Sequence, residues 1–176
     1  MNKTLLCNLD LLRRKFRGLS EDQNKATEEF RDTFLRMLDG FLDRQKNQVI
    51  FFSRDQNSLN NAQEAFDSAH PLYGYSTREQ VKNLLQEGEN SEYLIVSNKD
   101  VDFQMAVRFR VLLVIPLWIP HEDRAEHYGI TVDLPEQLFQ LCAQPRVCSL
   151  TGGSPVYPRP NQPDISESWD GISNDA

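Results

Sequence analysis

The sequence has few cysteines, no excess of basic residues and no long hydrophobic run, and each shortage argues against a class of protein. The odd number of cysteines, without paired metal-ligand spacing, argues against a disulfide scaffold and a zinc ribbon; they are Cys7, Cys142 and Cys148. The 26 acidic residues outnumber the 19 Lys and Arg residues, so a generally basic protein that coats nucleic acid is disfavoured. No apolar run approaches the roughly 20 residues of a membrane helix, and Asn8 and Asp10 interrupt the N-terminus too early for a signal peptide. We therefore expect a cytoplasmic protein with no membrane segment.

The composition changes near residue 150. Hydrophobic residues make up 39% of the chain, which is enough for a folded core. Residues 151–176 contain four of the nine prolines and one arginine against four carboxylates, a net charge of −3. We predict a domain over residues 1–150 followed by a Pro-rich, acidic, flexible tail over 151–176. An alternative is that Ile165 and Trp169, four residues apart, anchor a short docking helix in a partner protein.

Apolar strands and amphipathic helices alternate in the first 150 residues. Four short apolar runs predict buried strands at 4–7, 49–52, 93–96 and 111–115. Helical spacing of apolar residues, with capping boxes at Ser20/Gln23 and Ser76/Glu79, predicts helices over 24–45, 59–66, 76–85 and 101–109, and one from Pro135. This alternation predicts an α/β fold of three layers, α/β/α, with a mainly parallel central sheet.

Polar residues follow three of the predicted strands. Asn8 and Asp10 follow the first strand, Ser53 ends the second, and Asn98 and Asp102 follow the third. Because the carboxyl ends of parallel strands lie at one edge of the sheet, these side chains are expected to converge. Hydroxyl, amide and carboxylate oxygens in one place can hold Mg²⁺ together with a phosphate.

These strand ends resemble three motifs of the haloacid dehalogenase (HAD) superfamily, most of whose members are Mg²⁺-dependent phosphohydrolases. The matching segments are 5–10, 50–53 and 95–102. The resemblance implies a HAD-like Rossmannoid fold without a large cap domain. By the same resemblance, Asn8 takes the place of the nucleophile, Asp10 of the general acid and base, Ser53 of the phosphoryl ligand and Arg78 of the cation, with Lys82 as an alternative cation. The implied metal ligands are Asn8, Asp10, Asn98 and Asp102.

The match departs from the family at the residues on which catalysis depends. Asn8 stands where the family has its nucleophilic aspartate, and an amide cannot readily attack phosphorus. Asn98 replaces a metal-binding carboxylate, and Asp100 is a substitute in a different register. We therefore expect a weakened Mg²⁺ site and impaired hydrolysis. Either the chain is naturally a pseudoenzyme, or Asn8 is an engineered substitution in an active Mg²⁺-dependent phosphatase.

Further features have two interpretations each. Ser53 or Asp55 can act as the N-cap of the next helix. Segment 117–119, Leu-Trp-Ile, is either a loop or an exposed surface for a partner protein. A basic cluster either engages the phosphates of a nucleotide or nucleic-acid end or forms a solvated loop; it consists of Arg13, Arg14, Lys15 and Arg17. We expect the protein to bind a phosphorylated ligand or a protein partner, with an unknown oligomeric state.

Overall fold

The structure, a computed structural model, describes residues 2–44, 46–88, 91–122 and 129–143. Its strands are β1 (Asn2–Asn8), β2 (Gln48–Ser53), β3 (Tyr73–Thr77), β4 (Ser91–Val96), β5 (Leu112–Pro116) and β6 (Ile130–Val132). Its helices are the 3-10 helix η1 (Leu9–Leu12), α1 (Glu21–Leu42), α2 (Gln56–Phe66), α3 (Arg78–Glu87), α4 (Asp100–Phe109) and α6 (Pro135–Ala143). The predicted tail, with Ile165 and Trp169, lies outside the described residues.

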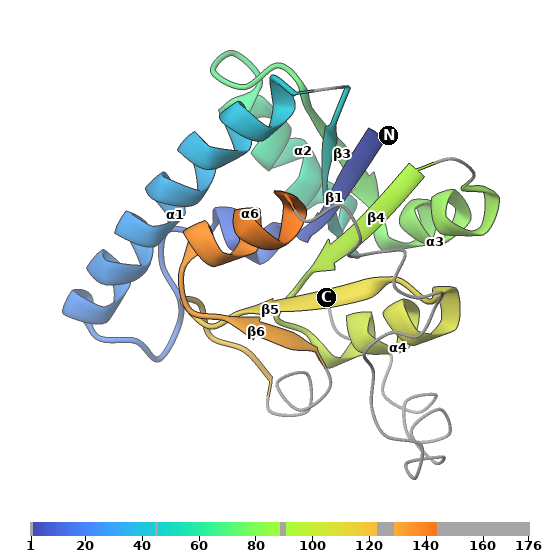
Figure 1. Ribbon diagram of the computed structural model, residues 1–176. Coiled ribbons are helices and arrows are strands. Elements are labelled where there is room, and N and C mark those ends of the chain that lie inside the picture. Colours follow the sequence, from blue (N-terminus) through green and yellow to red (C-terminus); the bar gives the residue numbers. More distant parts are fainter. Residues whose placement is uncertain (1, 45, 89–90, 123–128, 144–176) are drawn as a thin grey trace, which may run out of the picture.

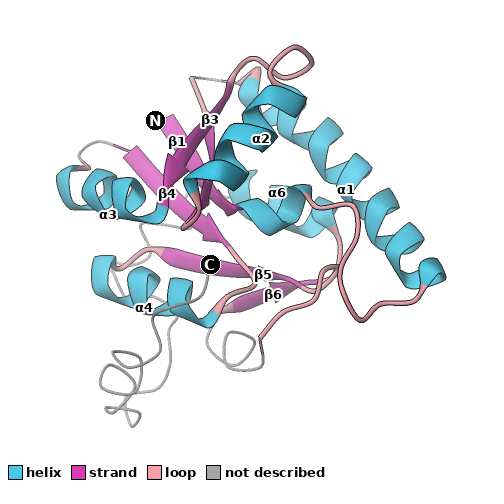
Figure 2. Cartoon of the chain, turned by 180° about the vertical axis from the view of Figure 1, so that it is seen from behind, coloured by secondary structure: helices cyan, strands magenta, loops and turns pink. Residues whose placement is uncertain are grey.

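The six strands form one sheet in the order β3-β2-β1-β4-β5-β6, and every pairing is parallel. Helices α1, α2 and α6 cover one face of the sheet, and α3 and α4 cover the other (Figure 1, Figure 2). This arrangement confirms the α/β fold class of three layers and the parallel central sheet that the sequence predicts. None of the described helices has both the length and the hydropathy that a membrane crossing requires.

Successive residues of the central strand pack on opposite faces of the sheet. Leu5 and Cys7 of β1 belong to the core beneath α1 and α6, together with Phe34. Leu6 belongs to the core beneath α3 and α4, together with Phe103. Because helices bury both faces, the strands are apolar at nearly every position, which is the pattern expected for a parallel sheet.

The helix starts show one correct and one incorrect prediction. Ser20 caps α1 with the predicted capping box, in which its Oγ accepts from the Gln23 N–H and the Gln23 side chain accepts from the Ser20 N–H. The helix therefore begins at residue 21, directly after the predicted cap and three residues before residue 24, where the helical spacing of apolar residues placed its start. The capping box predicted at Ser76 is wrong, because Ser76 lies within β3 and the cap of α3 is Thr77, paired with Gln80.

Two strands at the sheet edges were not predicted. β3 reads Tyr-Gly-Tyr-Ser-Thr, in which four of the five residues are only partly buried, so it lacks a continuous apolar run. β6 has three residues, too few for a recognisable period. Among the described residues each of these strands pairs with a single neighbour, and an edge strand needs less apolar sequence than a central one.

The loop after β5 is part of the core. Trp118 is 6% exposed and Ile119 4% exposed, so the interpretation of segment 117–119 as an exposed partner surface is wrong. The Trp118 ring packs 6.0 Å from the Phe34 ring and 6.4 Å from the Phe30 ring, centroid to centroid. This loop closes the end of the sheet against α1.

Candidate functional site

The candidate site lies where the carboxyl ends of β1, β2 and β4 meet. β1 is central, and the chain proceeds from it to β2 on one side and later to β4 on the other. Such a reversal of strand order opens a crevice beyond the strand ends, which is where open α/β sheets bind ligands. Asn8 ends β1 and is 2% exposed, and Ser97 directly follows β4 and is fully buried. The predicted strand-end residues therefore surround the switch point of the sheet.

The Asp102 carboxylate is the centre of a buried network. Arg78 donates to it twice, from Nε to Oδ1 at 2.7 Å and from Nη2 to Oδ2 at 3.2 Å. The Asn8 amide donates from Nδ2 to Oδ2 at 3.2 Å, and the Ser97 hydroxyl also donates to Oδ2. Asp102 lies in the first turn of α4 and is fully buried. Its charge is therefore balanced by a cation from the chain itself.

The fold brings Arg78 to Asp102 through the register of β2 and β3. Ser53 pairs with Thr77, so α3 begins at Arg78 beside the end of β2. The Arg78 guanidinium lies over the Phe52 ring, 5.5 Å from its centroid. The resemblance gives Arg78 the place of the family's cation, and in the structure its guanidinium is paired with Asp102. Lys82, the alternative cation, lies one turn further along α3 and its Nζ is 4.0 Å from a Glu79 carboxylate oxygen.

Asp10 forms a second, more exposed cluster. Its Oδ2 accepts from Asn98 Nδ2 at 3.0 Å and lies 3.7 Å from Lys99 Nζ. Its Oδ1 lies 3.3 Å from Arg13 Nε. The Asp10 N–H donates to Asn8 Oδ1 at 2.9 Å, so Asn8 is bonded to both clusters. Asn8 thus caps η1 with its oxygen and holds Asp102 with its nitrogen.

The four side chains implied as Mg²⁺ ligands come together but do not fit the ion as they stand. Asp102 accepts hydrogen bonds from Arg78, Ser97 and Asn8, and the Asn8 oxygen accepts from the Asp10 N–H. The buried Asn98 Oδ1 is the exception, since it has no donor among the residues described. In the described ranges, no three His, Cys, Asp or Glu side chains form a group that could hold a metal ion. Mg²⁺ is usually held by one or two carboxylates and completes its six oxygen ligands with water. Of the two implied carboxylates, Asp102 is paired with Arg78 and Asp10 lies beside Arg13 and Lys99, so both already have cationic partners.

A cleft of about 780 Å³ lies beside these clusters, between η1 and α2. Asn8, Asp10 and Ser53 line it at the strand ends, and Arg13 and Arg54 line it on the adjoining loops. The Ser53 Oγ accepts from the Asp55 N–H at 3.2 Å, and no acceptor for its own hydroxyl proton occurs among the described residues. This hydroxyl and the Arg54 guanidinium are therefore available to a ligand in the cleft.

Asp55, rather than Ser53, is the N-cap of α2. Its Oδ1 accepts from the Asn57 N–H at 3.1 Å, and its Oδ2 accepts from the Ser58 hydroxyl at 2.7 Å. The hydrogen bond from Ser58, followed by that from the Asn57 backbone, lowers the pKa of the Asp55 carboxyl. The positive end of α2 therefore already has a carboxylate partner, which leaves Ser53 without a capping role.

The predicted basic cluster forms an exposed loop between η1 and α1. Arg13 lines the cleft, while Arg14, Lys15 and Arg17 are exposed to solvent. The loop is held from beneath by the buried Arg31, whose Nε donates to the Leu12 carbonyl oxygen at 2.8 Å. Burial first, and then the nearby Arg14 charge, lower the pKa of Arg31.

Comparison with known proteins adds no relative to this picture. No model of a protein family matches the chain, and a search of curated proteins gives no significant match. The arrangement of side chains must therefore carry the functional interpretation.

Three site residues without a predicted role are Ser97, Lys99 and Arg54. Ser97 and Lys99 lie within residues 96–99, and Arg54 directly follows Ser53. The sequence therefore places all three at predicted strand ends. The contacts of these three residues cannot be read from the sequence, because they depend on which strands are neighbours in the sheet.

Proposed function

We propose that the chain is a HAD-like domain that binds a phosphorylated ligand in the cleft between η1 and α2 without hydrolysing it. The observation that carries the proposal is the pairing of the buried Asp102 carboxylate with Arg78. A guanidinium of this chain balances the charge that a metal ion would balance in a Mg²⁺-dependent phosphatase. The Asp102 carboxylate therefore has its counter-charge within the chain and does not need a metal ion to balance it.

Residue 8 supports a binding function rather than a hydrolytic one. Covalent phosphoryl transfer on this scaffold needs a carboxylate at this position, and Asn8 offers a neutral amide. Both of its polar atoms are engaged within the protein, the nitrogen with Asp102 and the oxygen with the Asp10 N–H. An aspartate would place a second carboxylate beside Asp102, about where the amide nitrogen now donates. This fit supports the interpretation in which Asn8 is the natural residue rather than an engineered one.

The cleft supplies groups that suit a phosphate. Ser53 offers a hydroxyl proton and Arg54 a guanidinium at the same strand end. Arg13 pairs with Asp10, but its side chain is 60% exposed and can turn to a ligand oxygen at little energetic penalty. Arginine and hydroxyl donors are the groups that recur around bound phosphates. The proposal retains the cytoplasmic location expected from the sequence, and Cys7 is a buried, unpaired thiol among the described residues.

The proposal is tested with p-nitrophenyl phosphate, by measuring turnover and binding separately. We expect the native chain to bind this ester equally in Mg²⁺ and in EDTA and to release no p-nitrophenol. Arg54→Met should weaken binding by about tenfold, the usual effect of one charge-assisted hydrogen bond. The matched substitution is Arg17→Met, which removes the same charge outside the cleft lining and should leave binding unchanged.

Three outcomes would oppose the proposal. Turnover by the native chain would show an active phosphatase, and binding that disappears in EDTA would show a required metal. Equal losses in Arg54→Met and Arg17→Met would show that the net charge, rather than the cleft, attracts the ester. Turnover that appears only in Asn8→Asp with Mg²⁺ would instead support it, because it would identify residue 8 as the missing nucleophile.

A phosphorylated nucleic-acid end is the phosphate source that would use the whole basic cluster. Each phosphate that Arg14, Lys15 or Arg17 neutralises adds to the salt dependence of the affinity. For a 5′-phosphorylated oligonucleotide we therefore expect a steeper fall in affinity with salt than for p-nitrophenyl phosphate. An equal salt dependence for the two ligands would mean that only the phosphate in the cleft is bound and that the basic cluster does not contribute.

A further inference from the structure

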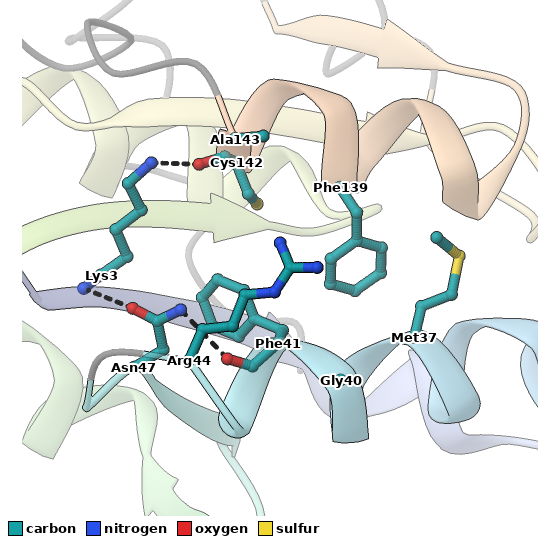
Figure 3. Close-up of a pocket in the computed structure, with 9 residues that line it drawn as sticks. All are labelled: Lys3, Met37, Gly40, Phe41, Arg44, Asn47, Phe139, Cys142 and Ala143. Carbon is teal, nitrogen blue, oxygen red and sulfur yellow. Dashed lines mark hydrogen bonds between the residues drawn. The ribbon is translucent and has the colours of Figure 1, made fainter.

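A second cavity, of about 390 Å³, lies far from the strand-end site, at the amino end of β1 between α1 and α6. Figure 3 shows its two walls, with Met37 and Phe41 on α1, Arg44 just after α1, and Phe139 on α6. The Phe41 and Phe139 ring centroids are 6.0 Å apart at 56°, so two aromatic rings form an apolar surface on one side of it. A cavity of this size and lining suits a small ligand with a flat apolar body.

Gly40 keeps this cavity open. It lies in the last turn of α1, where glycine is among the least favourable helix residues, and its φ angle is not positive. A Cβ added at Gly40 would meet nothing within 4 Å, so packing against the described residues does not require the glycine. A side chain at this position would enter the cavity. The glycine at this lining position therefore weakens the helix without being required for packing against the described residues.

Two cationic side chains, Lys3 and Arg44, are among the described residues that line the cavity. Arg44 lies one turn after Gly40, and Figure 3 shows its guanidinium directed toward the Phe139 ring. Among the described residues this guanidinium has no carboxylate or carbonyl partner. Lys3 lies on the opposite side, where its Nζ donates to the Cys142 carbonyl oxygen near the end of α6. Asn47 fixes the rim, because it accepts from the Lys3 N–H at 3.1 Å and donates to the Phe41 carbonyl oxygen at 3.0 Å.

We infer that this cavity binds a small carboxylate with a flat apolar body. The apolar body lies against Phe41, Phe139 and Met37 in the space above Gly40. The carboxylate receives hydrogen bonds from the Arg44 guanidinium, the group whose planar donors match a carboxylate best. This inference is independent of the proposed phosphate function, since the two sites share no residue.

The test uses the full chain with ¹³C-labelled methionine methyl groups and 2-naphthoate as the probe. We expect saturable shifts of the Met37 methyl signal. 2-Naphthalenemethanol, which has the same body without the charge, should bind at least about tenfold more weakly. Arg44→Met should weaken the binding of 2-naphthoate by a similar factor. Arg36→Met removes the same charge from an exposed position on α1 outside the cavity lining and should leave the affinity unchanged.

Gly40 provides the variant that separates binding from folding. Gly40→Leu should abolish the Met37 shifts and raise the urea midpoint of unfolding, because leucine favours the helix and fills the cavity. Gly40→Ala should raise the midpoint while binding persists. Equal binding of acid and alcohol, or of native chain and Arg44→Met, would overturn the inference, as would the absence of Met37 shifts. Nuclear Overhauser contacts from the Met37 methyl to residues after 143 in the free protein would also overturn it, since the chain itself would fill the cavity.

Discussion

The guanidinium of Arg78 donates two hydrogen bonds to the carboxylate of Asp102, of 2.7 Å from Nε to Oδ1 and 3.2 Å from Nη2 to Oδ2. The two side chains are 8% and 0% exposed. The pair connects the start of α3 to the start of α4 beneath the central strand ends. Together with the hydrogen bonds from Asn8 and Ser97, it gives the carboxylate a complete set of donors. The strand-end site is thus organised by an ion pair within the protein.

Arg78→Met is expected to lower the free energy of unfolding by about 3–5 kcal/mol. Methionine retains an apolar side chain over Phe52 but leaves the Asp102 charge buried without a cation, and this is the usual effect of removing one partner of a buried pair. Urea denaturation of the native chain and the variant gives the difference. The double variant Arg78→Met/Asp102→Asn should recover part of the loss, because the unpaired charge is gone. A double variant no more stable than Arg78→Met would show that the pair is not coupled.

Asn8→Asp is expected to make stability depend on Mg²⁺. The amide nitrogen of Asn8 is 3.2 Å from Asp102 Oδ2, so an ionised carboxylate there would oppose Asp102. Two like charges about 4 Å apart repel by about 4 kcal/mol at an effective dielectric constant of 20. We expect a lower melting temperature in EDTA and a partial recovery with Mg²⁺. The native chain, measured in parallel, should show no Mg²⁺ effect; equal responses of both proteins would contradict this prediction.

The central part of the fold is predictable from the sequence, because a strand that is buried on both faces is apolar at nearly every position. Four apolar runs gave β1, β2, β4 and β5 to within a few residues, and Ser20 and Gln23 gave the start of α1. The edge strands β3 and β6 were missed because their residues are only partly buried and their apolar pattern is short. The predicted cap of α3, Ser76, lies one residue before the actual cap, Thr77, because β3 continues directly to the start of α3.

Much of the candidate site is predictable as a set of residues, but its bonding is not. Parallel strands must bring Asn8, Ser53 and Asn98 to one edge, so their proximity follows from the alternation of strands and helices alone. The partner of Arg78 depends on the register of Ser53 with Thr77 and on the path of α4, neither of which the sequence pattern contains. Whether Asp102 faces a metal or a guanidinium is therefore a tertiary property.

Trp118 is expected to act as a core residue. Its ring is 6% exposed and packs against Phe30 and Phe34, so Trp118→Ala should lower the free energy of unfolding by about 3–5 kcal/mol. Its indole N–H is buried without an acceptor among the described residues. Trp118→Phe removes this unsatisfied donor along with part of the ring. It should therefore lower the free energy of unfolding by clearly less than Trp118→Ala does. Urea denaturation compares the two; equal losses would mean that the N–H has a partner, and no loss in Trp118→Ala would mean an exposed side chain.

Asp55 is expected to stabilise α2 in a manner that depends on pH. The Ser58 hydroxyl and the Asn57 N–H hold its folded-state pKa below the unfolded value of about 3.9. Its contribution is therefore fully present above the unfolded pKa and is lost as the pH falls through the folded pKa. Asp55→Asn keeps a capping oxygen without the charge, so the difference in urea midpoint between this variant and the native chain should be constant near neutral pH and change only in acid. Ser58→Ala removes the hydroxyl that donates to Asp55 Oδ2 and should raise the Asp55 pKa, as read from the pH titration of its ¹³C carboxyl signal. An unchanged Asp55 titration in Ser58→Ala would mean that the backbone N–H, rather than the Ser58 hydroxyl, stabilises the charged cap.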